Sequence, residues 1–134
     1  MKFTIYQSSR QGGRVYNQDR IAYSYSKEAV LAVIADGMGG HRHGEVAAQL
    51  AVTSLTDAFE RQALPRLQDP TGFLREHLWQ VHDAIGNFAR ANALIEAPRT
   101  TIVAAIMQGG KLYCAHAGDS RLYHFRQGEL LYRT

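Results

Sequence analysis

The sequence has 134 residues, of which 46% are hydrophobic and 20% charged, a size and composition typical of one globular domain with a single core. The net charge of +3 includes 15 Lys and Arg that are scattered along the chain, so we expect no nucleic-acid partner. No apolar stretch approaches the roughly 20 residues that cross a bilayer, and the N-terminus lacks the apolar region of a signal peptide, which predicts no membrane partner. The single cysteine, Cys114, excludes an internal disulfide and predicts a reduced, cytoplasmic protein in which it is a small buried residue.

The first third of the chain contains three segments with the composition of β-strands. Residues 3–7, 21–26 and 30–35 are rich in Ile, Val, Tyr and Ala and are separated by polar turns. The third segment is apolar on both faces. This pattern predicts a central strand that is covered on two sides.

Two helices are predicted next. Residues 45–63 repeat apolar side chains at steps of three and four, the pattern of an amphipathic helix. Asp69 and Pro70 indicate the start of a second helix, because Asp can cap the first turn and Pro fits the first helical position. The apolar stripe of this second helix fades near Pro98. Both stripes predict core packing.

After Arg99 the hydrophobic period returns to two, which predicts four strands in an antiparallel meander. Glycine-containing pairs between the strands, among them Gly118-Asp119, are typical of tight hairpin turns. The order of strands, two helices and strands predicts an α+β fold, in which helices pack on one face of a mostly antiparallel assembly. The four predicted strands cover residues 101–107, 111–117, 121–125 and 129–132.

The apolar strand over residues 30–35 is followed by Asp36 and then by the sequence GMGGH. Glycines before a helix suggest phosphate binding, but no P-loop Gly-Lys-Ser or Gly-Lys-Thr is present, and Arg42 occupies the last glycine position of the dinucleotide fingerprint. An aspartate beside flexible glycines suits Mg²⁺ or Mn²⁺ instead, because these cations take carboxylate and carbonyl oxygens. A turn-forming or helix-capping role for Asp36 is the open alternative.

Two further polar segments accompany Asp36. Arg14 and Asp19 lie on one short loop, GRVYNQDR, which is either an ordinary polar turn or part of a site. In a site, the carboxylate would hold a metal and the planar guanidinium would grip a phosphate with two N–H groups. The segment HAGDSR contains Asp119, for which a hairpin turn is a sufficient explanation.

Together these three segments resemble a known family. R-x-x-N-Q-D, an apolar strand that ends in D-G-M-G-G-H, and G-D-S-R are similar to the first three motifs of the metal-dependent protein phosphatases, the PPM or type 2C family, in its bacterial form. The resemblance extends from about Gln11 to Thr134. It implies an αββα sandwich of mostly antiparallel sheets flanked by helices, with a binuclear Mg²⁺ or Mn²⁺ centre at one edge. It also implies hydrolysis of phosphoserine and phosphothreonine in proteins, including the targets of a Ser/Thr kinase.

The resemblance assigns roles to five residues. Asp36 would bridge the two metals, and Gly37 would offer its carbonyl to one of them. Asp19 would lie in the inner shell or hold metal-bound water, and Arg14 would bind the substrate phosphate. Asp119 would lie near the centre, where the matching aspartate of some bacterial members helps to bind a third, weaker metal. Asp19 and Asp36 are thus the predicted catalytic residues, and a protein nucleophile is not required because paired metals activate water.

Two departures concern single positions. Gln18 stands where many members have Glu, so its role as a ligand stays open. Met38 stands where eukaryotic relatives have a histidine proposed as general acid, and a thioether cannot donate a proton. We interpret the nearby His41 and His43 as solvated loop residues.

A third departure concerns the later motifs of the family. Thr134 directly follows a strand pattern, and the motifs that supply two further metal-binding aspartates are absent. We therefore expect residues 1–134 to be the N-terminal portion of a single phosphatase domain, with little or no activity alone because two cations would lack ligands. The alternative is a non-catalytic regulatory or phosphoprotein-binding module that keeps the sandwich but not the metals.

Overall fold

The computed structural model describes residues 1–38 and 43–134. Helices α1 and α2 span Gly44–Gln62 and Pro70–Ala91. Strands β1 to β5 form one antiparallel sheet in the order β1-β2-β4-β5, with β3 also paired to β2, whereas β6 and β7 form a separate two-stranded sheet. The strands are β1 (Asp19–Tyr25), β2 (Ala29–Met38), β3 (Arg99–Thr100), β4 (Ile102–Gln108), β5 (Lys111–Ala117), β6 (Tyr123–Arg126) and β7 (Glu129–Arg133).

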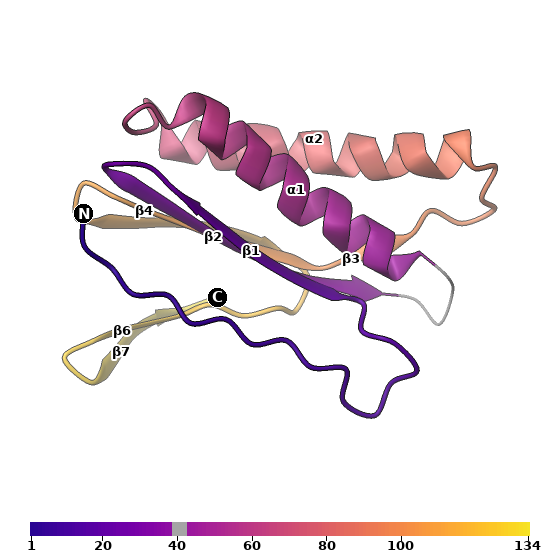
Figure 1. Ribbon diagram of the computed structural model, residues 1–134, viewed down its shortest axis with the longest axis horizontal. Coiled ribbons are helices and arrows are strands. Elements are labelled where there is room, and N and C mark those ends of the chain that lie inside the picture. Colours follow the sequence, from indigo (N-terminus) through magenta and orange to yellow (C-terminus); the bar gives the residue numbers. More distant parts are fainter. Residues whose placement is uncertain (39–42) are drawn as a thin grey trace.

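Both helices cover one face of the larger sheet, and the N-terminal arm and the β6–β7 hairpin lie on the opposite side (Figure 1). The core forms between helices and sheet because alternate residues of β2 face the apolar stripe of α1. Leu31, Val33, Leu55 and Phe59 are all 1% exposed or less. The predicted α+β architecture of antiparallel sheets flanked by helices is therefore confirmed.

Helix α2 begins as predicted from the sequence. The Asp69 side chain accepts a hydrogen bond from a backbone N–H of the first turn, and Pro70 occupies the first helical position. The helix ends at Ala91, before the predicted end near Pro98. The chain leaves the helix there because Ala93 adopts a left-handed conformation, with a φ of 52°, and the Leu94 N–H bonds back to the Ala89 carbonyl at 3.0 Å.

The prediction of a single antiparallel meander is wrong after β5. Strand β5 pairs with β4 along its length, but β6 pairs with β7 in a different sheet. Gly118 and Asp119 therefore form a crossing between two sheets and not a tight hairpin turn. Gly118 has a φ of 94°, a conformation that favours glycine and lets the chain change direction where β5 ends.

Two smaller predictions are also wrong. Residues 3–7 belong to an arm without strand pairing, because β-propensity makes a strand only where a neighbouring strand completes the ladder. Cys114 is half-buried and not buried, because β5 lies at the edge of the sheet. Among the described residues, neither helix combines the length and the hydrophobicity that crossing a membrane requires.

Candidate metal centre at the edge of the sheet

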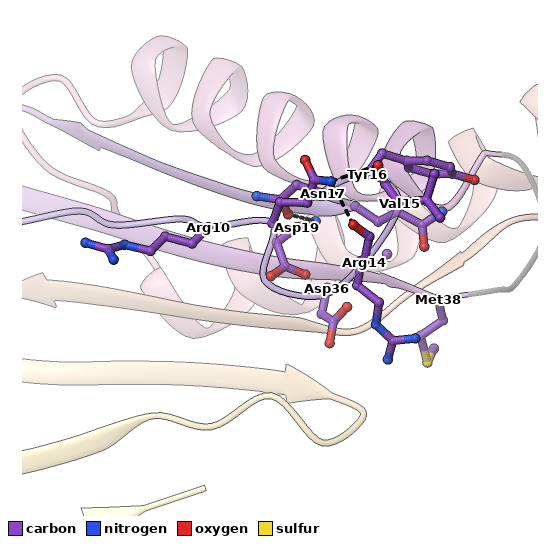
Figure 2. A pocket seen from close by; sticks show the side chains of 11 residues that line it. Arg10, Arg14, Val15, Tyr16, Asn17, Asp19, Asp36 and Met38 are labelled. Carbon is purple, nitrogen blue, oxygen red and sulfur yellow. Dashed lines mark hydrogen bonds between the residues drawn. The ribbon is translucent and has the colours of Figure 1, made fainter.

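Sheet pairing brings Asp19 and Asp36 directly opposite each other on β1 and β2. The backbone groups of Asp36 point away from β1, because its N–H and C=O both bond to Thr101 on the other side. Asp19 and Asp36 thus form a non-hydrogen-bonded pair, the closer kind in an antiparallel ladder, with Cα atoms about 4.5 Å apart. Figure 2 shows the two carboxylates projecting in the same direction. Because Asp36 lies within β2, the turn and helix-cap alternatives for it are wrong.

The alternation of side chains along β2 decides which face carries these carboxylates. Gly37 faces α1, since an added Cβ there would lie 2.3 Å from the backbone oxygen of Gly44. Successive residues of a strand point to opposite faces, so Asp36 and its partner Asp19 point away from the helices. The site therefore lies on the sheet face that the helices leave open.

Gln18 lies on the other face from the carboxylates. It is opposite Gly37, and its side-chain amide donates to Glu45 Oε2 on α1 at 3.3 Å. The side chain of Gln18 thus links the start of β1 to the first turn of α1. In this arrangement Gln18 is a structural contact and not a side-chain ligand beside Asp36.

The carbonyl of Gly37 is directed to the β1 side of the sheet. The N–H of Gly37 donates to the Gln18 carbonyl at 3.3 Å, and the N–H and C=O of one residue in a strand point to the same side. Asp19 begins β1 on that side. This is the orientation that a carbonyl ligand beside Asp19 and Asp36 requires.

Hydrogen bonds hold the loop before β1, and they involve Asn17, predicted only as part of a polar turn, and Gln11, for which no role was predicted. Asn17 Oδ1 accepts from the Asp19 N–H at 2.9 Å, an Asx-type turn for which an Asn two residues before the Asp is the sequence signal. Gln11 Nε2 donates to the carbonyls of Arg14 and Val15 at 2.7 and 2.8 Å. These bonds fix the backbone on which Arg14 and Asp19 stand.

Arg20 was also missed, and it joins this loop to α1. Its Nη1 donates to the carbonyls of Asn17 and Asp19 at 3.1 and 2.7 Å. Its Nε donates to Gln49 Oε1 at 3.1 Å. The position of Arg20 in the sequence did not indicate this role, because the contact of Arg20 with Gln49 depends on how β1 packs against α1.

The electrostatics of the site favour a cation. Partial burial raises the pKa of Asp36, and so do the hydrogen bond that protonated Asp36 can share with Asp19 and the negative charges of Asp19 and Asp119. The guanidinium of Arg14 acts in the opposite direction and lowers it. The structure thus brings Arg14, Asp19 and Asp119 close enough to act on Asp36. Hard carboxylate oxygens with an excess of negative charge fit Mg²⁺ or Mn²⁺.

A hollow of about 680 Å³ lies over this pair of carboxylates, between the arm and the ends of β1 and β2. Arg10 and Arg14 both line this hollow, but Arg14 lies beside Asp36, whereas Arg10 points away from both carboxylates (Figure 2). Met38 lines the same hollow. Among the described residues, no three His, Cys, Asp or Glu side chains come together as a complete metal site.

His43 is a loop residue, as predicted, but the prediction that it is solvated is wrong. His43 directly precedes α1 and is half-buried, and its ring packs edge-on against Phe88 of α2 with 5.9 Å between ring centroids. His41 lies outside the described residues. His43 therefore packs the start of α1 against α2, and it is not among the described residues that line the hollow.

Comparison with known families agrees with this geometry. The family model described as protein phosphatase 2C matches residues 7–132. The chain therefore belongs to the protein phosphatase 2C family, which confirms the resemblance inferred from the three motifs.

Individual relatives are bacterial. The serine/threonine phosphatase stp of Listeria monocytogenes serovar 1/2a is 37% identical over 112 residues, which cover 82% of this chain and 44% of that protein. The serine/threonine protein phosphatase PstP of Mycobacterium tuberculosis is 37% identical over 122 residues, covering 87% of this chain and 21% of that protein. The chain thus spans less than half the length of these relatives.

Solved structures show the same fold. The catalytic domain of PstP in complex with two manganese ions matches with a TM-score of 0.77 and 32% identity, over 92% of this chain and 51% of that chain. The serine/threonine phosphatase Stp1 from Staphylococcus aureus matches with a TM-score of 0.78 and 29% identity, over 89% of this chain and 47% of that chain. The shared fold extends over about half of each solved chain.

Proposed function

We propose that residues 1–134 are the N-terminal part of a protein phosphatase domain that removes phosphate from phosphoserine and phosphothreonine in proteins, including the targets of a Ser/Thr kinase. The observation that carries this proposal is the close cross-strand pair of Asp19 and Asp36 beside the guanidinium of Arg14. Membership of the protein phosphatase 2C family supports the reaction. The two manganese ions in the PstP domain support the choice of cation.

Each residue of the site has a distinct part in this proposal. Asp36 and Asp19 would hold two divalent cations, with the Gly37 carbonyl as a further ligand and Asp119 near a third. When bound, Mn²⁺ or Mg²⁺ lowers the pKa of water and neutralises charge that develops on the phosphate. Arg14 would orient the substrate phosphate through paired N–H donors.

The loop hydrogen bonds contribute by keeping the site in place before substrate arrives. Asn17 and Arg20 both bond to the backbone of Asp19, so this carboxylate needs little rearrangement when it binds an ion. Arg14 stands on the same loop, which Gln11 closes. The distance between Asp19, the metal ligand, and Arg14, which binds the phosphate, is thus set by the short segment 14–19.

The proposal predicts a large difference between the isolated chain and the extended domain. Two carboxylates and one carbonyl are too few ligands for two cations that each prefer about six. We expect residues 1–134 with Mn²⁺ to release little or no phosphate from a phosphoserine peptide, and the domain extended by the missing motifs to release it until EDTA is added. Release by the isolated chain at the rate of the extended domain would contradict the partial-domain assignment. Phosphate release by the extended domain that EDTA does not reduce would contradict the proposed metal-dependent function.

Replacing Arg14 should separate phosphate binding from the rest of the site. A charge-assisted hydrogen bond contributes about 1.5–3 kcal/mol, so Arg14→Ala in the extended domain should lower kcat/KM by about 10- to 100-fold, mainly through KM. Arg14→Lys keeps the charge but loses the paired donors, so its kcat/KM should lie between those of wild type and Arg14→Ala. Arg10→Ala is the matched control, because Arg10 points away from both carboxylates (Figure 2), and should stay within about threefold of wild type. Equal losses for Arg10→Ala and Arg14→Ala would refute the specific role of Arg14.

A further inference from the structure

Thr101 lies directly across the sheet from Asp36. Strand β2 pairs with β3 and with β4 in one continuous register, and Thr101 is the residue between those two strands. Its N–H donates to the Asp36 carbonyl at 2.8 Å, as in an ordinary antiparallel ladder. The Asp36 N–H, however, donates to the side-chain Oγ1 of Thr101 at 3.2 Å. Both backbone groups of Asp36 are therefore bonded to Thr101.

The backbone of Thr101 is turned to make this possible. Its carbonyl accepts a hydrogen bond from the Thr100 hydroxyl at 2.8 Å, and the side-chain oxygen takes the place of that carbonyl toward Asp36. This substitution coincides with the interruption between β3 and β4. The strand is thus interrupted at Thr101 because a side-chain hydroxyl, and not a backbone carbonyl, accepts the hydrogen bond from the Asp36 N–H.

The same hydroxyl holds the segment around Asp119. Thr101 Oγ1 is hydrogen-bonded to Ser120 Oγ. On the other side of Asp119, Gly118 packs so closely that an added Cβ would lie 2.8 Å from Thr101 Cγ2. Thr101 therefore contacts both neighbours of Asp119 as well as the backbone of Asp36.

Burial makes these contacts hard to replace. Thr101 is 1% exposed, so water cannot readily substitute for its hydroxyl, and an unpaired buried N–H of Asp36 would be costly. A threonine hydroxyl has one hydrogen and two lone pairs, enough to accept from the Asp36 N–H and to bond Ser120 at the same time. The negative charges of Asp36 and Asp119 act on each other, so some contact must resist their separation.

We propose that Thr101 is a positioning residue that sets the separation of Asp36 and Asp119. Its hydroxyl fixes the Asp36 backbone and the crossing after β5 together, so that both carboxylates serve one metal centre. This role rests on the proposed function, because it concerns ion binding by Asp36 and Asp119. Thr101 acts through these two residues and touches neither ion nor substrate.

The test uses the 134-residue chain with three substitutions and a matched control. Thr101→Val has the same shape without the hydroxyl, Thr101→Ser keeps the hydroxyl, and Ser120→Ala removes only the partner near Asp119. Thr71→Val is the control, because it makes the same change of side chain at an exposed position of α2, away from Thr101 and Asp36. Amide hydrogen exchange reports the Asp36 N–H without metal, and paramagnetic broadening of amide signals during a Mn²⁺ titration reports which residues share an ion.

The variants should separate into distinct patterns. In Thr101→Val, exchange at Asp36 should become about five- to tenfold faster, and broadening at Asp119 should require several-fold more Mn²⁺ than broadening at Asp19. Thr101→Ser and Thr71→Val should behave as wild type in both measurements. Ser120→Ala should keep the slow exchange at Asp36 but shift the broadening at Asp119.

Other outcomes have different meanings. A folded Thr101→Val chain with wild-type exchange and broadening would overturn the positioning role, and so would a Thr101→Ser chain that matches Thr101→Val, since packing would then explain both. If Mn²⁺ broadened no signals near Asp19 or Asp36 even in the extended wild-type domain, the proposed metal-dependent function would fail. In that case faster exchange at Asp36 in Thr101→Val would still support the anchoring of its backbone by the hydroxyl, and unchanged exchange would overturn it.

Discussion

Replacing Asp36 with asparagine should lower the Mn²⁺-dependent kcat/KM of the extended domain by more than about a hundredfold, because even supporting partners of metal ligands contribute about 10- to 100-fold. Asp36 is the residue on which the pair with Asp19, the charge of Asp119 and the guanidinium of Arg14 all act. An amide in its place offers a weaker oxygen ligand to a hard cation. Phosphate release and calorimetric titration with Mn²⁺ would measure the loss, and an unchanged rate would show that Asp36 is not a ligand.

The same substitution should stabilise the metal-free chain at neutral pH. The pKa of Asp36 is raised in the folded state, so its contribution to stability is present below the usual pKa of 3.8 and is lost as the pH rises through the raised value. At pH 7 the ionised carboxylate is therefore unfavourable in the folded chain without metal. Removing the charge opposite Asp19 should raise Tm by about 2–5 °C, and this gain should shrink as the pH approaches 3.8.

Added Mn²⁺ should reverse the order of stability. An ion that binds the folded state raises Tm, so wild type should gain stability with Mn²⁺ and Asp36→Asn should not. Asp57→Asn is a suitable control, because Asp57 is exposed on α1 and should leave both the pH dependence and the Mn²⁺ response unchanged. If Asp36→Asn had a lower Tm than wild type without metal at pH 7, the result would contradict the repulsion between the carboxylates of Asp36 and Asp19.

Gly37→Ala should destabilise the fold and weaken ion binding together. The added Cβ would lie 2.3 Å from the Gly44 oxygen and 2.8 Å from the Gln18 oxygen, and both are backbone atoms that cannot rotate away. Either β2 or the start of α1 must move, and overpacking of this kind costs about 1–3 kcal/mol or more. We expect Tm to fall by about 5–15 °C, with weaker Mn²⁺ binding because the Gly37 carbonyl moves with β2.

A glycine of the neighbouring loop provides the control for this variant. Gly13 has no atom within 4 Å of an added Cβ and no left-handed backbone, so Gly13→Ala should leave Tm unchanged or slightly higher. Thermal unfolding and Mn²⁺ titration of both variants would separate a general effect of alanine from the specific clash. Wild-type stability of Gly37→Ala would show that α1 does not start against β2 as described.

The close packing at Gly37 changes the interpretation of the glycine after Asp36. The sequence suggested that this glycine gives the backbone the flexibility to turn a carbonyl toward a metal. In the structure Gly37 is an ordinary residue of β2, and the absence of a side chain matters because α1 starts against it. The prediction of a carbonyl ligand stays compatible with the geometry, but for a different reason, since strand direction and not flexibility aims the carbonyl toward β1.

Local sequence signals were sufficient for most of the elements. The apolar period, the cap at Asp69 and the proline that follows it depend on residues within a turn or two, so the first helix, the start of the second and most strands could be predicted within a few residues. The three motifs and the family could be recognised for a related reason, because each motif is a short run of neighbouring residues. The nature of the site, oxygen ligands beside a phosphate-binding arginine, follows from those residue types alone.

The tertiary structure decided everything that depends on strand register and on which sheet a strand joins. A shift of the β1–β2 register by one residue would have placed Gln18 and not Asp19 on the face with Asp36, and no local pattern distinguishes the two. The assignment of β6 and β7 to a second sheet, and the hydroxyl of Thr101 that bonds Asp36 across 65 residues of sequence, likewise come from contacts between distant segments. The sequence by itself therefore determined the ligand types and the elements that carry them. Only long-range pairing determined which of these side chains meet.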